Sequence, residues 1–310
     1  MNATITQLHA QQPAPQMPPQ TSHAPSIESS ALLAELSIGL WEGRKKDKQA
    51  TATITTLNKT QKNAARVYKD LLIDCEELMA VKRYSTDIRD FHRNSTLPWS
   101  NMGHRLLTNS YFLDYKRHMD EMIATFKELV EEFLQAYAWE VTAVQAKLGD
   151  MYDPNDYPSV ETLRSKFKIR VNYMPIPPRG DFRLDVNAQA REVLEESYSK
   201  FYEEQLASAM ADVAKRVVEP LQNMSKMLDY GEGERATGFH HTLVSNVLEV
   251  VDVLKACNVT QDPKLDKIRM DLKQALSGVT TEGLRRDPHL RAKTKQEVDS
   301  IIKTLPSLGW

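Results

Sequence analysis

The sequence predicts a mainly α-helical protein: an elongated antiparallel two-helix coiled-coil stalk with a small β-hairpin tip and flanking helices. Two long segments with helical periodicity enclose a short segment in which apolar and polar residues alternate. The second long segment begins near Asn187 and runs to Leu228, with Pro220 expected to kink or split it. The first runs to about Leu148, and its apolar residues show the three-and-four spacing of a heptad seam: Phe112, Tyr115, Met119, Met122, Phe126, Leu129 and Phe133.

Composition divides the chain into four parts. Residues 1–27 contain five prolines and no charged side chain, so we expect a disordered tail. Residues 28–107 should form an N-terminal helical region with one short strand. The coiled-coil hairpin then occupies residues 108–230, with its β tip at 149–186. A C-terminal helical region, residues 231–310, completes the chain.

The N-terminal region combines the short strand with a cluster of basic residues. Apolar residues alternate from Leu36 to Trp41, which indicates the strand, and helical periodicity follows from Ala64 to Met79. Eight basic residues lie between Trp41 and Lys69, against Glu42 and Asp47. A solvated surface is the commoner explanation, because the cluster lacks interleaved aromatic residues for base stacking. The alternative is a phosphate-binding patch, for which the candidate residues are Arg44, Lys45, Lys46 and Lys48.

The tip is predicted from its turn and strand signals. Gly149 is placed to end the first long helix, and Ser159 can cap a short helix that follows. Residues 167–173 and 182–186 then alternate as two half-buried strands of a hairpin. A lone hairpin is marginal in water, so its apolar face must pack on the helices or on a partner. The candidate partner-binding residues are Ile169, Val171, Tyr173, Arg179 and Phe182.

The C-terminal region should contain three helices after a flexible linker at residues 231–234. The first has helical periodicity from Leu243 to Leu254. The second and third begin with an Asp-Pro pair, at Pro263 and Pro288, which suits an N-cap followed by the first helical position. We expect these helices to fold against one another or along the stalk base.

No motif for catalysis, cofactor binding or metal binding is evident, so we expect neither enzymatic activity nor a cofactor. P-loop, HExxH and GxSxG motifs are absent, and no His has a Glu three residues before it, as a di-iron helix requires. Cys75 and Cys257 are expected to be buried thiols. No apolar run approaches the ~18 residues that cross a bilayer, and no signal peptide is evident, so we expect a cytoplasmic protein. The net charge of −2 indicates no polyanionic partner.

Several uncommon stretches resemble the bacterial and phage family called domain of unknown function 3150. They occur in order within about residues 33–277: Leu36–Lys46, Leu97–Gly103 with Arg105–Leu107, Tyr157–Phe167, Pro177–Arg183, Leu243–Val247 and Asn258–Pro263. The resemblance implies genes encoded beside a MoxR-type AAA+ ATPase and a von Willebrand A-domain protein. It carries over no catalytic residue, because the family defines none.

These observations favour a non-enzymatic helical interaction protein of a bacterium or phage, acting as an accessory or adaptor subunit of a MoxR-type AAA+ ATPase system. Self-association is a further expectation, because a heptad seam can pair between chains. Two alternatives stay open. One is a nucleic-acid-binding protein of phage DNA metabolism that uses residues 44–69, and the other is a structural component of the virion.

Overall fold

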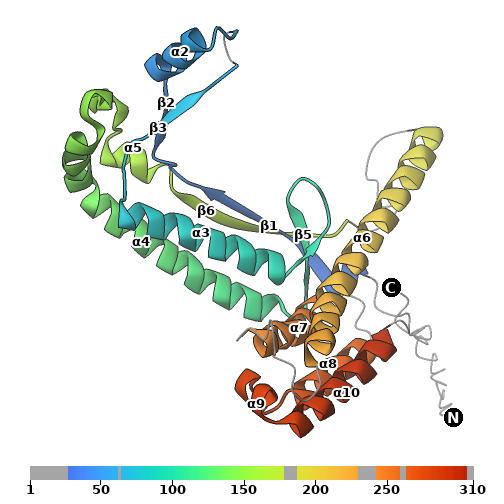
Figure 1. The fold of residues 1–310 in the computed structure, drawn as a ribbon. Helices are drawn as coiled ribbons and strands as arrows, with labels where there is room; N and C mark the ends of the chain where they lie inside the picture. The colour runs from blue at the N-terminus through green and yellow to red at the C-terminus, as the bar shows by residue number, and fades with distance from the viewer. Residues whose placement is uncertain (1–26, 62–63, 178–186, 230–241, 259–262, 306–310) are drawn as a thin grey trace, which may run out of the picture.

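The computed structural model describes residues 27–61, 64–177, 187–229, 242–258 and 263–305. The described chain is mainly helical, with a small antiparallel sheet at its centre (Figure 1). The sheet has the strand order β4-β5-β1-β6, and a separate two-stranded ribbon joins β2 to β3. None of the described helices is long and apolar enough to span a membrane.

The strands of the central sheet come from distant parts of the sequence. Its longest strand, β1 (Ala31–Gly39), pairs with β5 (His104–Thr108) on one side and with β6 (Lys168–Pro175) on the other. The short β4 (Leu97–Pro98) extends the sheet beyond β5. The ribbon consists of β2 (Arg44–Asp47) and β3 (Val67–Asp70).

Alternate residues of the sheet serve two hydrophobic clusters. Because successive side chains of a strand point to opposite faces, Leu33 and Leu106 enter one cluster while Ala34 and Leu107 enter the other. We call the cluster that contains Ala34 and Leu107 the N-terminal cluster, and the one that contains Leu33 and Leu106 the C-terminal cluster. Strands buried on both faces therefore join the two halves of the molecule.

The N-terminal cluster is covered by two helices that lie side by side, α3 (Glu76–Asn94) and α4 (Phe112–Leu148). Short elements complete this half: α1 (Ile27–Ser30), α2 (Lys48–Leu57), α5 (Val160–Arg164) and 3-10 turns at Gly149–Met151 and Pro154–Asp156. Gly149 ends α4 with a φ of 51°, and Ser159 caps α5, so both terminal signals are confirmed.

The C-terminal cluster is formed by the second half of α6 (Ala188–Leu228) and the helices packed on it. These are α7 (Leu243–Cys257), α8 (Pro263–Ala275), α9 (Thr281–Arg286) and α10 (Pro288–Thr304). Asp287 caps α10 through its side chain, as expected for an Asp-Pro pair. The α6 helix continues through Pro220 without a break in the helix.

Both long helices have the predicted bounds, but they do not form the predicted stalk. The main helical neighbour of α4 is α3, whereas α6 packs on α7 and α10. The heptad seam identified the buried face of α4 correctly, since Tyr115, Met119 and Phe126 are buried. It could not identify the partner, because α3 also buries apolar residues along one face, namely Leu78, Val81 and Ile88.

Two predictions for the N-terminal region are wrong. Residues 28–107 contain five strands instead of one, and residues 67–70 form strand β3 where a helix was predicted. Pairing with β2 decides the conformation of this segment, because strand pairing overrides a short helical pattern. The predicted strand at 36–41 is also longer and begins at Ala31.

The first strand of the predicted hairpin is present as β6, but it pairs with β1. The second predicted strand, at 182–186, lies outside the described residues, and so do residues 1–26 of the predicted tail and the predicted linker at 231–234.

Candidate interaction surfaces

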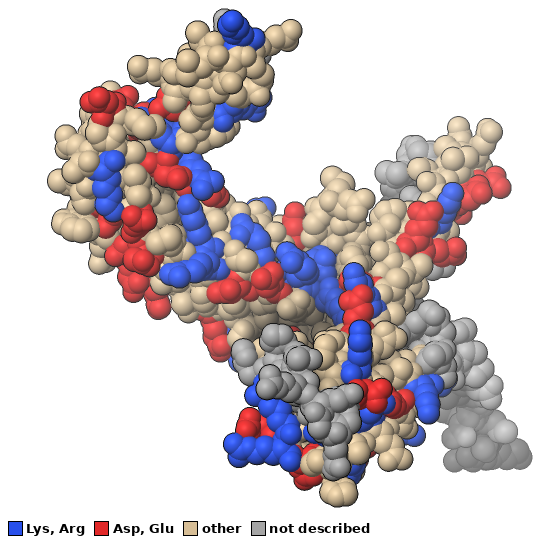
Figure 2. All heavy atoms as spheres, viewed as in Figure 1, with Lys and Arg blue, Asp and Glu red and all other residues tan. Residues whose placement is uncertain are grey.

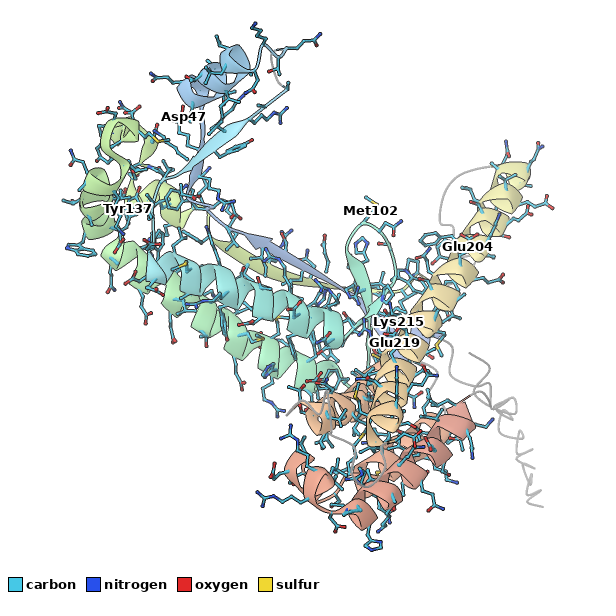
Figure 3. All side chains as sticks on the ribbon, in the orientation of Figure 1. Asp47, Met102, Tyr137, Glu204, Lys215 and Glu219 are labelled. Atoms are coloured by element: carbon cyan, nitrogen blue, oxygen red, sulfur yellow. The ribbon has the colours of Figure 1, made fainter. Side chains whose placement is uncertain are left out.

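Two elements extend from the same side of the sheet and give the molecule an open, curved shape (Figure 1). One is the ribbon together with α2, residues 44–70, which we call the arm. The other is the first half of α6, residues 188–206, which we call the α6 projection. Between them rises the turn that joins β4 to β5, with Met102 near its tip (Figure 3).

The arm is joined to the rest of the chain by a buried carboxylate, Asp156. Lys45 pairs with Asp156, and Lys69 Nζ lies 2.7 Å from Asp156 Oδ2. Burial raises the pKa of Asp156, but hydrogen bonds from the two lysines outweigh it and lower the pKa below its usual value. The same hydrogen bond raises the pKa of Lys45. Asp156 therefore holds two like-charged residues of the arm against the 3-10 turn.

Of the four candidate phosphate-binding residues, two are engaged within the protein. Arg44 Nε donates to Asp70 Oδ1 at 2.8 Å, and Lys45 is paired with Asp156. Lys46 and Lys48 are exposed, and the described residues give neither of them an ion pair. Lys46 lies opposite Tyr68 in the ribbon, and 56% of Tyr68 is exposed. The predicted patch is therefore reduced to Lys46, which lies opposite the exposed Tyr68, and Lys48 at the start of α2.

The predicted tip residues lie within the protein's own N-terminal cluster. Ile169 is opposite Ile38 and Val171 is opposite Leu36 in the pairing of β6 with β1. All of these residues are partly buried against the cluster. The ring of Tyr173 meets the ring of Phe112 edge-on, with centroids 5.2 Å apart.

The sequence left open whether this apolar face packs on the protein's own helices or on a partner. In the structure it packs on α4 within the N-terminal cluster. Ile169, Val171 and Tyr173 do not form a free partner-binding surface. The other two tip residues, Arg179 and Phe182, lie outside the described residues.

The α6 projection carries an apolar stripe that the other described elements leave uncovered. The first buried residue of α6 is Tyr202, so the 14 residues from 188 to 201 contain none. Val193 is 61% exposed and Phe201 is 41% exposed, while Leu194 and Tyr198 are half-buried. Further along, α7 and α10 cover the same helix. This change from uncovered to covered helix is not evident in the sequence, because the apolar spacing continues through it.

Two contacts between described residues anchor the projection near its base. Tyr198 Oη donates to the Pro177 carbonyl oxygen at 2.8 Å, and the Tyr202 ring meets the Trp99 ring edge-on at 5.2 Å. The charged side chains of the projection are mainly acidic, as Figure 2 shows. Two are basic, Arg191 and Lys200, and five are acidic: Glu192, Glu195, Glu196, Glu203 and Glu204. The projection is therefore apolar on one face and mainly negative around the rest of the helix, with Glu195 and Glu204 beside the apolar face.

A charged cleft of about 940 Å³ separates α3 and α4 from α6 and α7, beside Lys215 and Glu219 in Figure 3. An ion pair and a hydrogen bond join the walls of this cleft. Lys255 Nζ lies 2.8 Å from Asp114 Oδ2, and Arg216 Nη1 donates to the carbonyl oxygen of Arg93 at 2.9 Å. The pKa of Asp114 is lowered by the hydrogen bond from Lys255. Both contacts link the two halves of the molecule, and the Lys255–Asp114 pair neutralises two charges that a ligand would otherwise meet.

Comparisons of the chain with protein-family models, with curated proteins and with solved structures gave no match.

Proposed function

We propose that the chain is a non-enzymatic interaction protein that binds a protein partner through the α6 projection. The observation that carries the proposal is the uncovered stripe with Val193 and Phe201 exposed. Fourteen helical residues extend about 21 Å, and a helix of that length gains little stability in water without apolar packing. A partner that covers the stripe would supply that packing.

The chemistry of the projection defines the complementary surface. The partner should offer an apolar groove that accepts side chains at i, i+4 and i+7, here Leu194, Tyr198 and Phe201, in the manner of helix-in-groove recognition, with the exposed Val193 beside them. Lysine or arginine residues should line the groove, because the stripe is edged by glutamates. The rest of the molecule would act as a rigid support for the helix.

The resemblance to the domain of unknown function 3150 family supports a particular class of partner. We place the chain as an accessory or adaptor subunit of a MoxR-type AAA+ ATPase system in the cytoplasm of a bacterial or phage-infected cell. The ATPase or an A-domain protein encoded beside it would provide the groove.

The test is affinity capture of the tagged full-length protein from its native cells after nuclease treatment, with identification of co-purifying proteins by mass spectrometry. The variant carries Val193→Asp and Phe201→Asp. The matched control is Leu113→Asp, which makes the same change at a 75% exposed position of the other long helix. We expect the wild type and the control to capture an AAA+ ATPase or A-domain protein, and the variant to lose it. Equal capture by the variant would refute the assigned surface, provided that its far-UV circular dichroism matches the wild type.

A second copy of the chain could also cover the stripe. Light scattering of the purified protein separates this outcome from the first. A dimer that the double substitution converts to a monomer would identify self-association as the role of the projection.

Binding of nucleic acid by the arm is the second candidate function, favoured by the position of Lys46 opposite Tyr68. A lysine beside an exposed ring offers a phosphate contact together with a stacking surface. Fluorescence anisotropy with a labelled single-stranded oligonucleotide, at several salt concentrations, tests it. Binding should weaken steeply with salt and be lost in the Lys46→Glu, Tyr68→Ala variant but not in a Lys127→Glu control.

A further inference from the structure

Two helices bring a thiol and two carboxylates together beside the N-terminal cluster. Cys75 precedes α3 and Glu77 lies in its first turn, while Glu140 projects from the second half of α4. One ligand atom from each side chain lies within 4.8 Å of the other two. Cys75 Sγ is 3.7 Å from Glu77 Oε2. No metal site was evident here in the sequence, because Glu140 is remote from Cys75 and Glu77 in the chain.

The thiol is buried and directed into this group. Cys75 is only 2% exposed, and the one side-chain partner of Sγ among the described residues is Glu77, itself a member of the group. Burial raises the pKa of Cys75 to about 11; the backbone of Leu78 acts in the opposite direction, and the charges of Glu140 and Glu77 add to the rise.

Neither Glu77 nor Glu140 forms an ion pair within the described ranges, although both are half-buried. The cation whose charge acts on Glu140 is Lys147. Its ammonium group instead donates to the Ile73 carbonyl oxygen at 3.0 Å and lies 3.5 Å from Asp74 Oδ2. Burial and the charge of Glu77 consequently raise the pKa of Glu140.

We propose that Cys75, Glu77 and Glu140 bind one divalent transition-metal ion, and that zinc is the ion that fits best. Zinc accepts both sulfur and carboxylate oxygen, and three protein ligands leave the fourth tetrahedral position for water. Zinc–ligand bonds of about 2.0–2.3 Å place neighbouring ligand atoms roughly 3.3–3.8 Å apart in a tetrahedron, so small side-chain rotations complete the site. The thiolate selects against magnesium and calcium, which prefer oxygen ligands alone.

Binding exchanges a proton for the metal. The Cys75 thiol loses its proton to solvent and forms the sulfur–metal bond, while the two carboxylates add their oxygens as ligands. One proton is therefore released for each ion bound. The metal also fastens the start of α3 to α4, which are otherwise joined in this region by apolar contacts and by Lys147.

The experiment uses the full-length protein, stripped of metal with a chelator, and cadmium as a spectroscopic probe for the zinc position. Cadmium bound to a thiolate gives a charge-transfer absorption in the ultraviolet. We expect the band to saturate at one equivalent of cadmium and to disappear when zinc is added in competition. Potentiometric measurement of the released proton provides an independent readout.

The variants separate this site from the other thiol. Cys257 lies in the C-terminal cluster and is 1% exposed, so Cys257→Ser is the matched control for Cys75→Ser. We expect Cys75→Ser to abolish the band, Cys257→Ser to retain it, and Glu140→Gln to weaken cadmium affinity at least tenfold. Glu140 is half-buried, and its amide variant keeps the side-chain shape, so this variant provides a test if Cys75→Ser fails to fold.

Absence of the band in the wild type, or a band that persists in Cys75→Ser, would overturn the proposal. Unchanged affinity in Glu140→Gln would remove that residue from the site. Cadmium binding that zinc does not displace would show a soft-metal thiol only and would overturn the assignment of zinc.

Discussion

The stability of the fold should fall as pH decreases from 7.5 to 5 because of one buried histidine. His92 is 6% exposed, its Nδ1 lies 2.7 Å from Tyr115 Oη, and its Nε2 has no hydrogen-bond partner among the described residues. Burial lowers the pKa of His92 from 6.5 to about 4, and the charges of Arg105 and Arg93 add to this effect. His92 is therefore neutral in the folded protein at neutral pH.

The magnitude follows from proton linkage. Between pH 6.5 and pH 4 the unfolded chain binds a proton at this position and the folded chain does not, so acidification favours unfolding. The lowering from 6.5 to about 4 corresponds to about 3 kcal/mol once both states are protonated. At pH 5 about 2 kcal/mol of this should already be lost relative to pH 7.5.

The assay is urea denaturation at pH 7.5, 6.5, 5.5 and 5.0, followed by far-UV circular dichroism. The His92→Asn variant keeps a polar group near Tyr115 but does not titrate. Other groups, such as Asp156 with its lowered pKa, contribute equally to both proteins, so the difference between the two curves isolates His92. Parallel curves for the wild type and the variant would refute the reasoning.

Three further substitutions test the packing of the N-terminal half. Phe133→Ala should destabilise the fold by about 3–5 kcal/mol, because Phe133 is fully buried among three aromatic rings; urea denaturation measures it, and a loss below 1 kcal/mol would contradict the packing. Asp156→Asn should release the arm by removing the partner of Lys45 and Lys69, seen as faster amide hydrogen exchange in β2 and β3 with unchanged exchange in α10. Gly43→Ala should lower stability by more than 1 kcal/mol, because its φ of 65° strains an L-residue and the new Cβ would lie 3.0 Å from a Leu78 methyl; an unchanged unfolding midpoint would show that the turn relaxes.

The ends of the long helices were predictable because their signals are local. Gly149 ends α4 and Asn187 caps α6 through hydrogen bonds within four residues of the terminus. The buried face of α4 was also predictable, because periodicity reports on a single helix. None of these signals depends on distant residues.

The pairing of elements was not predictable from the same patterns. A heptad seam states that one face is apolar, and both α3 and a second long helix satisfy that condition. The partner of β6 is β1, with paired residues 129 to 143 positions apart, and alternation does not specify which strand of suitable pattern will pair. The predicted hairpin was the simplest local choice, and the sheet uses a non-local one.

The candidate sites show the same limit. Lys45 and Asp156 are 111 residues apart, so the neutralisation of the basic cluster could not be seen in the sequence. The exposure of Val193 depends on where α7 and α10 stop covering α6, which is a property of packing. Cys75 and Glu77 are neighbours in the chain, but their convergence with Glu140 requires α3 to lie along α4.

The use of β1 by both hydrophobic clusters has a consequence for how the protein folds. Its partners β5 and β6 are separated from it by long stretches of chain, so we expect loop closure to make formation of the sheet slow. Until β1 is in place, neither cluster can exclude water completely. We expect the two halves to unfold in one cooperative transition, and a fragment ending at residue 177 to expose Leu33 and Leu106 and to aggregate. The two halves are distinct in shape but constitute a single folding unit.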